Sequence, residues 1–293
     1  MSDPYDEYRS LLFSIAYRVL GTAADAEDAV QDTWLKWSAA DRSRVADPRA
    51  YLVRIVTNVS IDRLRAERSR RETYVGPWLP EPVPTSTDTA VDADSVSIAL
   101  LVVLETLSPI ERAVFVLREA FDFSHAEIAE AMGRSEESVR QTAHRARAHV
   151  AARRPRLQVD RRRQQVVTER FLTASTGGDI NALLELMAPD VALWTDGGGK
   201  VRQALKPIVG AERVAAWFAG VVRRPYEGVE IAAMTTEIVE LNGIPAIVFT
   251  GGGRVLSVLG LDLDADGRVV AIHNIANPDK LRAVATGSPP SLG

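Results

Sequence analysis

The amino-acid sequence predicts two all-α domains followed by an α+β domain. Over the first half of the chain, apolar residues recur with the period of amphipathic helices, and a proline-rich stretch interrupts this pattern once. Beyond about residue 165, helices are followed by short apolar runs that strong turn signals separate, a pattern typical of an antiparallel meander. We therefore expect domains over residues 1–71, 95–155 and 163–285, with a linker over residues 72–94.

Composition limits the function classes that fit this chain. At 293 residues and 46% apolar content, it is long enough for two or three domains with proper cores. The net charge of −4 means that any nucleic-acid binding must come from local basic patches. Without cysteine and with only four histidines, we expect no disulfide, no metal and no cofactor. No signal peptide or membrane-spanning run is present, which predicts a cytoplasmic protein without membrane contact.

Three helices are expected in the first domain. Residues 5–20 repeat apolar side chains at helical spacing, and Gly21 is suited to end that helix. Thr22 is a good N-cap for a second helix, whose expected buried face includes Trp34. Asp47-Pro48 combines an N-cap with proline at the first helical position and opens a long third helix.

Two of these helices present polar stripes. The second helix directs an acidic stripe outward, formed by Asp25, Asp28 and Asp32 beside Leu35. Such a stripe suits docking to a basic helix of another protein, although a merely solvated charged face is an equal alternative. The third helix carries a second stripe at i, i+4, i+8 and i+11, which can hold a phosphate backbone and hydrogen-bond splayed bases: Arg54, Asn58, Asp62 and Arg65.

The linker contains a hydrophobic pair. Residues 72–94 lose the helical period and hold four prolines, which keep a chain extended and semi-rigid. Trp78 and Leu79 lie in the middle of this stretch. Because large apolar side chains rarely stay in water without a partner, we expect this pair to occupy a pocket.

Residues 124–150 predict a helix-turn-helix. Ser124 and Glu127 form a capping box, Gly133 ends the first helix and Ser135 caps the second. The second helix directs long hydrogen-bond donors outward, as a recognition helix in a major groove would. An αα-hairpin with a solvated basic face is the alternative. The candidate DNA-binding residues are Arg134, Arg140, Gln141, His144, Arg145 and Arg147.

The last third predicts helices and then strands. A helix before Gly177-Gly178 and a second helix lead to a strand near residues 191–194. A further helix is expected over residues 214–222. Asn242-Gly243 and Asp266-Gly267 are strong hairpin turns between the later strands, which we place at residues 229–240, 244–250, 254–264 and 268–275.

The first half resembles an extracytoplasmic-function sigma factor of bacterial RNA polymerase, with region 2 over residues 5–71 and region 4 over residues 95–153. The resemblance rests on DAEDAVQDTW at Asp25–Trp34, the helix Tyr51–Arg65, SPIER at Ser108–Arg112 and the helix-turn-helix. The second half resembles a SnoaL-like domain, a cone-shaped fold shared with ketosteroid isomerases. The combination is similar to the SigJ-type subgroup of these sigma factors, whose marks are WLPEP at 78–82, DGGGK at 196–200 and NPDKL at 277–281.

The resemblance implies a role for each surface. The acidic helix would dock on the clamp helices of the polymerase β′ subunit, the third-helix stripe would face the minus 10 promoter element, and the recognition helix would read the minus 35 element. The fused domain would regulate the sigma domains within the same chain. Its expected regulatory contacts are Trp78, Leu79, Asp196, Lys200, Asn277, Asp279 and Lys280.

Two other functions stay open for the C-terminal domain. It could be an isomerase- or hydrolase-like enzyme in which Asp196 and His273 share a cone-shaped pocket, or it could bind a small molecule without turnover. His273 in a strand and Asp196 before three glycines are weak catalytic candidates, because such residues are commonly a satisfied imidazole and a turn residue. We therefore expect no catalysis. We expect a monomer, because reading a directional promoter needs no two-fold symmetry.

Overall fold

The computed structural model describes residues 3–71, 73–85, 97–153 and 160–286. Parts of the predicted linker and of the second helical domain, at residues 72, 86–96 and 154–155, lie outside the described residues. Within the described ranges, no helix has the length and apolar character needed to cross a bilayer.

The first three helices have the boundaries that their caps predict. They are α1 (Pro4–Leu20), α2 (Ala23–Ser38) and α3 (Pro48–Arg71), with a short 3₁₀ turn at Arg42–Arg44. Thr22 caps α2 by accepting a hydrogen bond from the Asp25 backbone, and Gly21 ends α1 in the left-handed conformation at φ 84°. Apolar side chains from all three helices, among them Leu12, Val30 and Leu52, pack together in the core.

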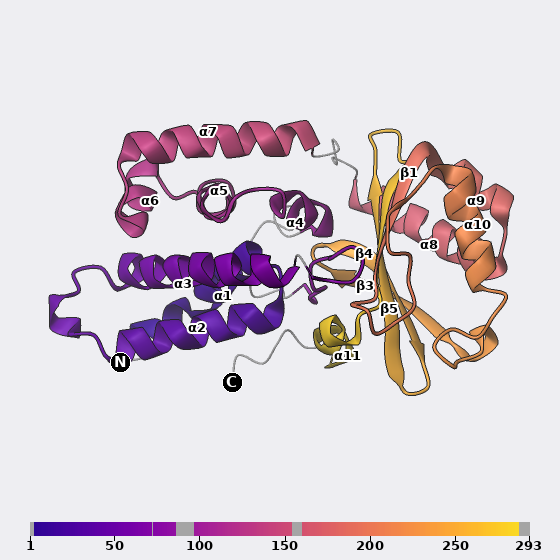
Figure 1. Cartoon of the computed structure of the whole chain (residues 1–293), viewed down its shortest axis with the longest axis horizontal. Coiled ribbons are helices and arrows are strands. Elements are labelled where there is room, and N and C mark those ends of the chain that lie inside the picture. The colour runs from indigo at the N-terminus through magenta and orange to yellow at the C-terminus, as the bar shows by residue number, and fades with distance from the viewer. Residues whose placement is uncertain (1–2, 72, 86–96, 154–159, 287–293) are drawn as a thin grey trace.

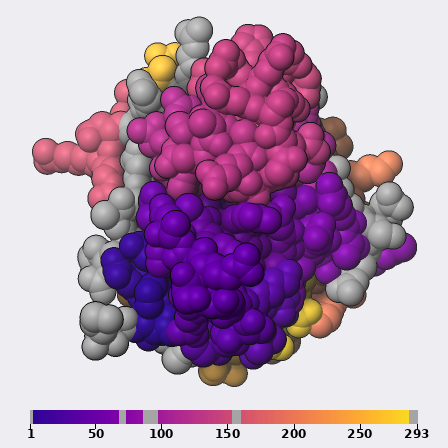
Figure 2. Space-filling view, turned by 90° about the vertical axis from the view of Figure 1, so that its left-hand side faces the viewer, coloured from indigo at the N-terminus to yellow at the C-terminus, as the bar shows by residue number. Residues whose placement is uncertain are grey.

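The second helical unit contains the predicted helix-turn-helix. Its elements are α4 (Ile98–Leu104), α5 (Pro109–Phe115), a π-helical turn (Val116–Ala120), α6 (His125–Met132) and α7 (Glu136–Arg153). Both expected capping boxes are formed, at Ser108 with Glu111 and at Ser124 with Glu127. Side chains of α1–α3 and α5–α7 form one continuous buried cluster, so the two helical units pack directly on each other (Figure 2).

The C-terminal domain combines helices with one six-stranded sheet. Its helices are α8 (Arg161–Gly177), α9 (Ile180–Leu186), α10 (Ala211–Val221) and α11 (Arg282–Thr286). Its strands are β1 (Met187–Asp196), β2 (Ile208–Val209), β3 (Thr235–Leu241), β4 (Ile244–Gly251), β5 (Arg254–Leu263) and β6 (Val269–Ile275). Strands β3 to β6 form the expected antiparallel meander, and the sheet order is β2-β1-β6-β5-β4-β3.

Two details of the sheet differ from the sequence-based expectation. Strand β1 pairs in parallel with β6, which closes the meander onto an earlier part of the chain. The strand expected from residue 229 begins only at Thr235, because Tyr226 and Val229 form a tight turn and Ile231–Ala233 form a 3₁₀ turn.

The two faces of the sheet have different neighbours (Figure 1). One face packs on α8, α9 and α10 around Phe171, Leu193 and Leu259. The opposite face packs on the linker and on the second helical unit, through Leu79 and Ile98. The sheet therefore separates α8, α9 and α10 from the two N-terminal helical units, and the linker lies between the sheet and the first helical unit.

Candidate nucleic-acid interface and the linker clasp

The acidic stripe of α2 is partly exposed and its carboxylates have partners within the chain. The Arg63 guanidinium of α3 reaches both the Asp28 carboxylate at 3.2 Å and the Asp32 carboxylate at 2.7 Å. Leu35 is 58% exposed beside them. Asp25 is half-buried and accepts a hydrogen bond from the Thr22 hydroxyl. Sequence reasoning missed Arg63, which lies beside the third-helix stripe.

One residue of that acidic helix is placed differently from the prediction. Trp34, expected in the core, is 37% exposed, although its ring stands 4.9 Å from the Tyr5 ring. The fully buried face of α2 runs through Val30, Thr33 and Trp37, so position 34 falls at its edge. An exposed tryptophan therefore adjoins the acidic stripe.

The third-helix stripe is exposed along most of its length, and one of its residues contacts the helix-turn-helix. Arg54, Asp62 and Arg65 are exposed, and Asp62 pairs with Arg65 at 2.9 Å. Asn58 is half-buried, because its side-chain amide donates to the Ala131 carbonyl of α6 at 3.0 Å. The surface expected to meet single-stranded bases is thus partly covered by the second helical unit.

All six candidate residues of the helix-turn-helix are exposed: Arg134, Arg140, Gln141, His144, Arg145 and Arg147. Several of their charges are paired within the domain. The Arg140 guanidinium contacts Glu136 at 2.7 Å, and the Arg147 guanidinium contacts Glu119 at 2.6 Å. Surface ion pairs of this kind contribute little stability, so the side chains can exchange a carboxylate for a phosphate at low cost.

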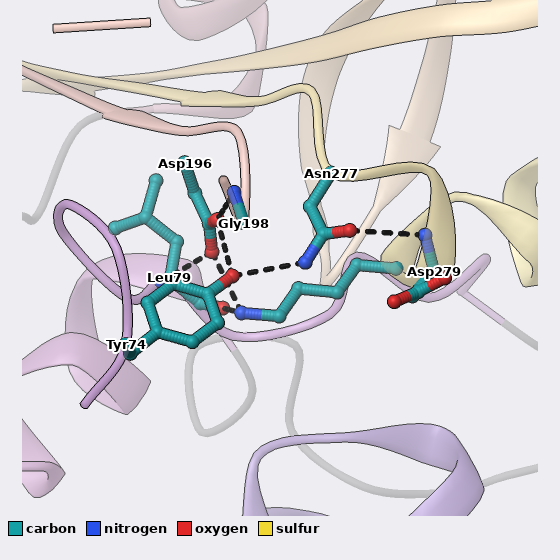
Figure 3. A network of polar contacts seen from close by, with 7 residues as sticks. Tyr74, Leu79, Asp196, Gly198, Asn277 and Asp279 are labelled. Atoms are coloured by element: carbon teal, nitrogen blue, oxygen red, sulfur yellow. Dashed lines mark hydrogen bonds and ion pairs between the residues drawn. The ribbon is translucent and has the colours of Figure 1, made fainter. Parts of the chain in front are cut away.

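The linker is held by a buried polar network, which we call the linker clasp and define by Tyr74, Leu79, Asp196, Asn277 and Lys280 (Figure 3). Asp196 ends β1 and is fully buried. Its carboxylate accepts from the Leu79 backbone at 2.9 Å, from the Tyr74 hydroxyl at 2.5 Å and from the Lys280 ammonium at 2.6 Å. A buried carboxylate needs this degree of compensation, because its desolvation is costly.

Lys280 completes the clasp from the opposite side. Its ammonium donates to the Leu79 carbonyl at 2.6 Å and stands 4.1 Å from the centre of the Trp78 ring. The Asn277 amide donates to the Tyr74 hydroxyl at 2.9 Å. Burial, and then the neighbouring Asp196 carboxylate, raise the pKa of the Tyr74 hydroxyl, which therefore stays a hydrogen-bond donor. The linker is consequently fixed to the sheet by both its backbone and its side chains.

The lysine that contacts the linker is Lys280, and Lys200 lies elsewhere. Lys200 pairs with Asp279 at 2.5 Å at the surface, with both side chains about half exposed. Of the DGGGK loop, Asp196 hydrogen-bonds the linker and Gly199 lies against Val75. Tyr74 was not among the expected contact residues, although an aromatic side chain four residues before Trp78 was a usable sequence signal.

The far end of the linker joins the first helical unit to the sheet. The Glu81 carboxylate accepts from the Ala23 backbone at 2.8 Å, and the Tyr17 hydroxyl donates to the Glu81 carbonyl at 2.7 Å. Tyr17 in turn accepts from the Asn242 amide at 2.6 Å. Because Asn242 forms the turn between β3 and β4, this turn anchors the linker as well as reversing the chain.

The C-terminal domain also contains a cavity of about 690 Å³ between α10 and the sheet. The alternative in which Asp196 and His273 share such a pocket does not fit the structure, because neither side chain lines the cavity. Asp196 belongs to the linker clasp. His273 lies on the same face of the sheet as Asp196, the face that packs on the linker. Its Nε2 is 2.8 Å from the Asp262 carboxylate, and its ring stacks on Trp194. Among the described residues, no group of three or more potential metal ligands comes together.

Comparison with known proteins places the two helical units. Residues 4–70 match the Sigma-70 region 2 family, and residues 97–150 match the Sigma-70, region 4 family. The chain is 38% identical to the ECF RNA polymerase sigma factor SigJ of Mycobacterium tuberculosis, over 97% of this chain and 93% of that protein. It is 30% identical to the probable ECF RNA polymerase sigma factor SigI of the same species, over 98% of each.

The whole arrangement has a solved counterpart. The crystal structure of the Mycobacterium tuberculosis extracytoplasmic function sigma factor SigJ matches with a TM-score of 0.75 and 35% identity, over 98% of this chain and 99% of that chain. The match includes the α+β domain together with both helical units, and the predicted fold class is confirmed. The chain belongs to the extracytoplasmic-function sigma factors of bacterial RNA polymerase, the proteins that direct promoter-specific initiation of transcription.

Proposed function

We propose that each exposed surface performs the role expected for its sigma region. The α2 stripe of Asp25, Asp28, Asp32 and Leu35 binds the clamp helices of the polymerase β′ subunit. The α3 stripe of Arg54, Asn58, Asp62 and Arg65 captures bases of the minus 10 element, and the exposed donors of the helix-turn-helix read the minus 35 element. The protein acts as a monomer in the cytoplasm and without catalysis. The exposure of Asp28, Leu35, Arg54, Asp62, Arg65 and the six helix-turn-helix residues supports the proposal.

We further propose that the C-terminal domain regulates the sigma domains by holding them closed. The observation that carries this proposal is the hydrogen bond from Asn58 to Ala131, because it joins the minus 10 surface to the helix-turn-helix. Figure 2 shows the two helical units in direct contact over a broad face.

Promoter geometry requires these two surfaces to separate. Elements centred about 25 base pairs apart lie roughly 85 Å apart along B-form DNA with its rise of about 3.4 Å per base pair. In the closed arrangement, atoms of α3 and α6 are 3.0 Å apart. The two surfaces cannot engage one straight promoter in that state, so initiation requires opening.

The linker clasp supplies the restraint. It fixes the linker to the sheet at Asp196 and Lys280, while Glu81 fixes it to the start of α2. The sheet also packs on Ile98 of α4, so the domain contacts both helical units. An equilibrium between closed and open states follows, and polymerase, by binding only the open state, shifts it.

The test combines transcription with a distance readout. The chain has no cysteine, so Ala66→Cys and Ala148→Cys provide two unique labelling sites on exposed positions of α3 and α7. We expect core polymerase to reduce energy transfer between these labels.

On a candidate promoter, Lys280→Met should increase the amount of run-off transcript, whereas the surface control Lys200→Met should not. Unchanged energy transfer in a polymerase complex that initiates normally would refute regulation by closure.

A further inference from the structure

The cavity of about 690 Å³ in the C-terminal domain has the composition of a small-molecule site. Trp217 of α10 and Phe249 of β4 supply aromatic walls. Sites of about 300–1,000 Å³ that combine apolar walls with a few polar groups commonly bury a small ligand. Aromatic walls favour a flat ring system, because stacked or edge-on rings gain more than burial alone.

The floor of the cavity offers unsatisfied hydrogen-bonding capacity. Ser257 of β5 lines the cavity and is only 7% exposed. Across the described parts of the chain, its hydroxyl has no hydrogen-bond partner. A ligand atom that reaches this hydroxyl can therefore hydrogen-bond it without displacing a protein partner. Asn274 of β6, 4% exposed, adds an amide to the same floor.

The rim of the cavity is positively charged. Arg223 and Arg224 follow the end of α10 and line the opening together with Glu230. Within the described residues, neither arginine takes part in an ion pair. Two guanidinium groups against one carboxylate favour an anionic group at the mouth, and guanidinium forms bidentate hydrogen bonds with acids. The ligand chemistry that fits is therefore a planar aromatic body that carries an acidic group.

One side chain connects this cavity with the linker clasp. Gln203 donates to the Tyr226 hydroxyl at 2.6 Å and accepts from the Asn274 amide at 3.4 Å, and both of these partners line the cavity. Gln203 lies in the loop of residues 197–207, which begins directly after Asp196. The loop is tightly packed, since a Cβ atom at Gly197 would lie 2.9 Å from Cγ of Gln203. Gln203 thus packs against the residue that directly follows Asp196.

We propose that the cavity is an effector site for a planar aromatic acid, and that Gln203 transmits its occupancy to the linker clasp. The acidic group of the ligand pairs with Arg223 and Arg224 at the rim, while its ring system covers the floor at Ser257 and Asn274. The ring system thereby displaces the Asn274 amide from Gln203, which that amide now contacts at 3.4 Å. The released loop loosens Asp196 and frees the linker. This inference deepens the proposed regulation and rests on it for the consequence in transcription, but not for binding or for the linker response.

The binding test uses two fluorescent probes that share their rings and differ in charge. With the full chain, 8-anilinonaphthalene-1-sulfonate should bind at least severalfold more tightly than the uncharged N-phenyl-1-naphthylamine. Ser257→Leu fills the cavity floor and should weaken sulfonate binding about tenfold, with unchanged thermal unfolding to show that the variant folds. Thr173→Leu, an exposed position on α8, is the control for non-specific binding. Equal binding by these two variants would overturn the site.

The coupling test measures amide hydrogen exchange in residues 73–85. Saturating sulfonate probe should accelerate exchange there severalfold in the wild-type chain. Gln203→Ala should keep probe binding within about threefold and abolish the probe's effect on residues 73–85. Binding without any change in linker exchange would overturn the coupling. Neither readout involves polymerase or promoter, so a failure here is distinct from a failure of the proposed transcriptional role.

Discussion

The linker clasp predicts a large difference between two chemically identical substitutions. Lys280 and Lys200 each pair with an aspartate, at 2.6 Å and 2.5 Å. The Lys280 and Asp196 side chains are 7% and 0% exposed, whereas those of Lys200 and Asp279 are 53% and 52% exposed. The environments of the two pairs therefore differ while their chemistry does not.

The expected magnitudes follow from burial. Breaking a buried ion pair by removing one partner costs about 3–5 kcal/mol, because a charge is left uncompensated. Asp196 keeps the Tyr74, Leu79 and Gly198 donors, so we place Lys280→Met at the lower end, about 3 kcal/mol. Lys200→Met should cost less than about 1 kcal/mol, as exposed pairs do. The ratio of the two effects is the quantity that tests the structure.

The assay is urea unfolding of the full chain followed by far-ultraviolet circular dichroism. Lys280→Met should shift the midpoint strongly and Lys200→Met hardly at all, with similar slopes. Asp196→Asn combined with Lys280→Met should cost less than the sum of the single substitutions, because the partners are coupled. If Lys280→Met and Lys200→Met prove equally mild, the buried pair does not hold the linker and the reasoning fails.

Three further predictions concern other parts of the molecule. Gly21 has φ 84°, and an added Cβ would lie 2.8 Å from Cη2 of Trp78. Gly21→Ala should therefore destabilise the chain by at least about 1–2 kcal/mol, measured by thermal unfolding. A neutral effect would contradict the tight contact. The Ser108 hydroxyl lowers the pKa of Glu111, so the stability that this carboxylate contributes is present above its ordinary value of 4.5 and is lost as pH falls through the lowered value. The free energy of unfolding lost in Glu111→Gln should accordingly be larger near pH 7 than near pH 3, and a pH-independent loss would refute the argument. Arg63→Gln frees the Asp28 and Asp32 carboxylates and should tighten binding of the chain to core polymerase severalfold, measured by fluorescence anisotropy at low salt. The control Arg170→Gln on α8 should leave this affinity unchanged. Weaker binding by Arg63→Gln would show that Arg63 positions the two carboxylates instead of competing with polymerase for them.

Sequence reasoning was most successful where the determinants are local. The capping box of Ser124 with Glu127 and the left-handed Gly133 define the helix-turn-helix, because each involves residues only a few positions apart. The Trp78-Leu79 pair was expected to find a pocket from its apolar character alone. Leu79 is 1% exposed, whereas Trp78 is half-buried. Such features depend on propensity and capping, which a single sequence carries in full.

Contacts between distant segments could not be derived in the same way. Nothing local distinguishes Lys280 from Lys200 as the partner of Asp196, since both follow short turn motifs. The face of the sheet on which His273 lies could not be derived from the sequence, because both faces are covered and strand alternation does not tell them apart. The parallel pairing of β1 with β6 likewise depends on how the chain closes, which spacing between strands does not reveal.

The position of the linker clasp in the chain has a consequence for protein synthesis. The helices of the two sigma-region units end at Arg153, whereas Asp196 and Lys280 are translated later. At elongation rates of about 5–20 residues per second, Lys280 follows Arg153 by roughly 6–25 seconds. During that interval the nascent sigma helices have left the peptidyl-transfer centre while the lysine that closes the clasp has yet to be added. Each newly made chain therefore passes once through a stage without the linker clasp, and the order of domains along the messenger sets how long that stage lasts.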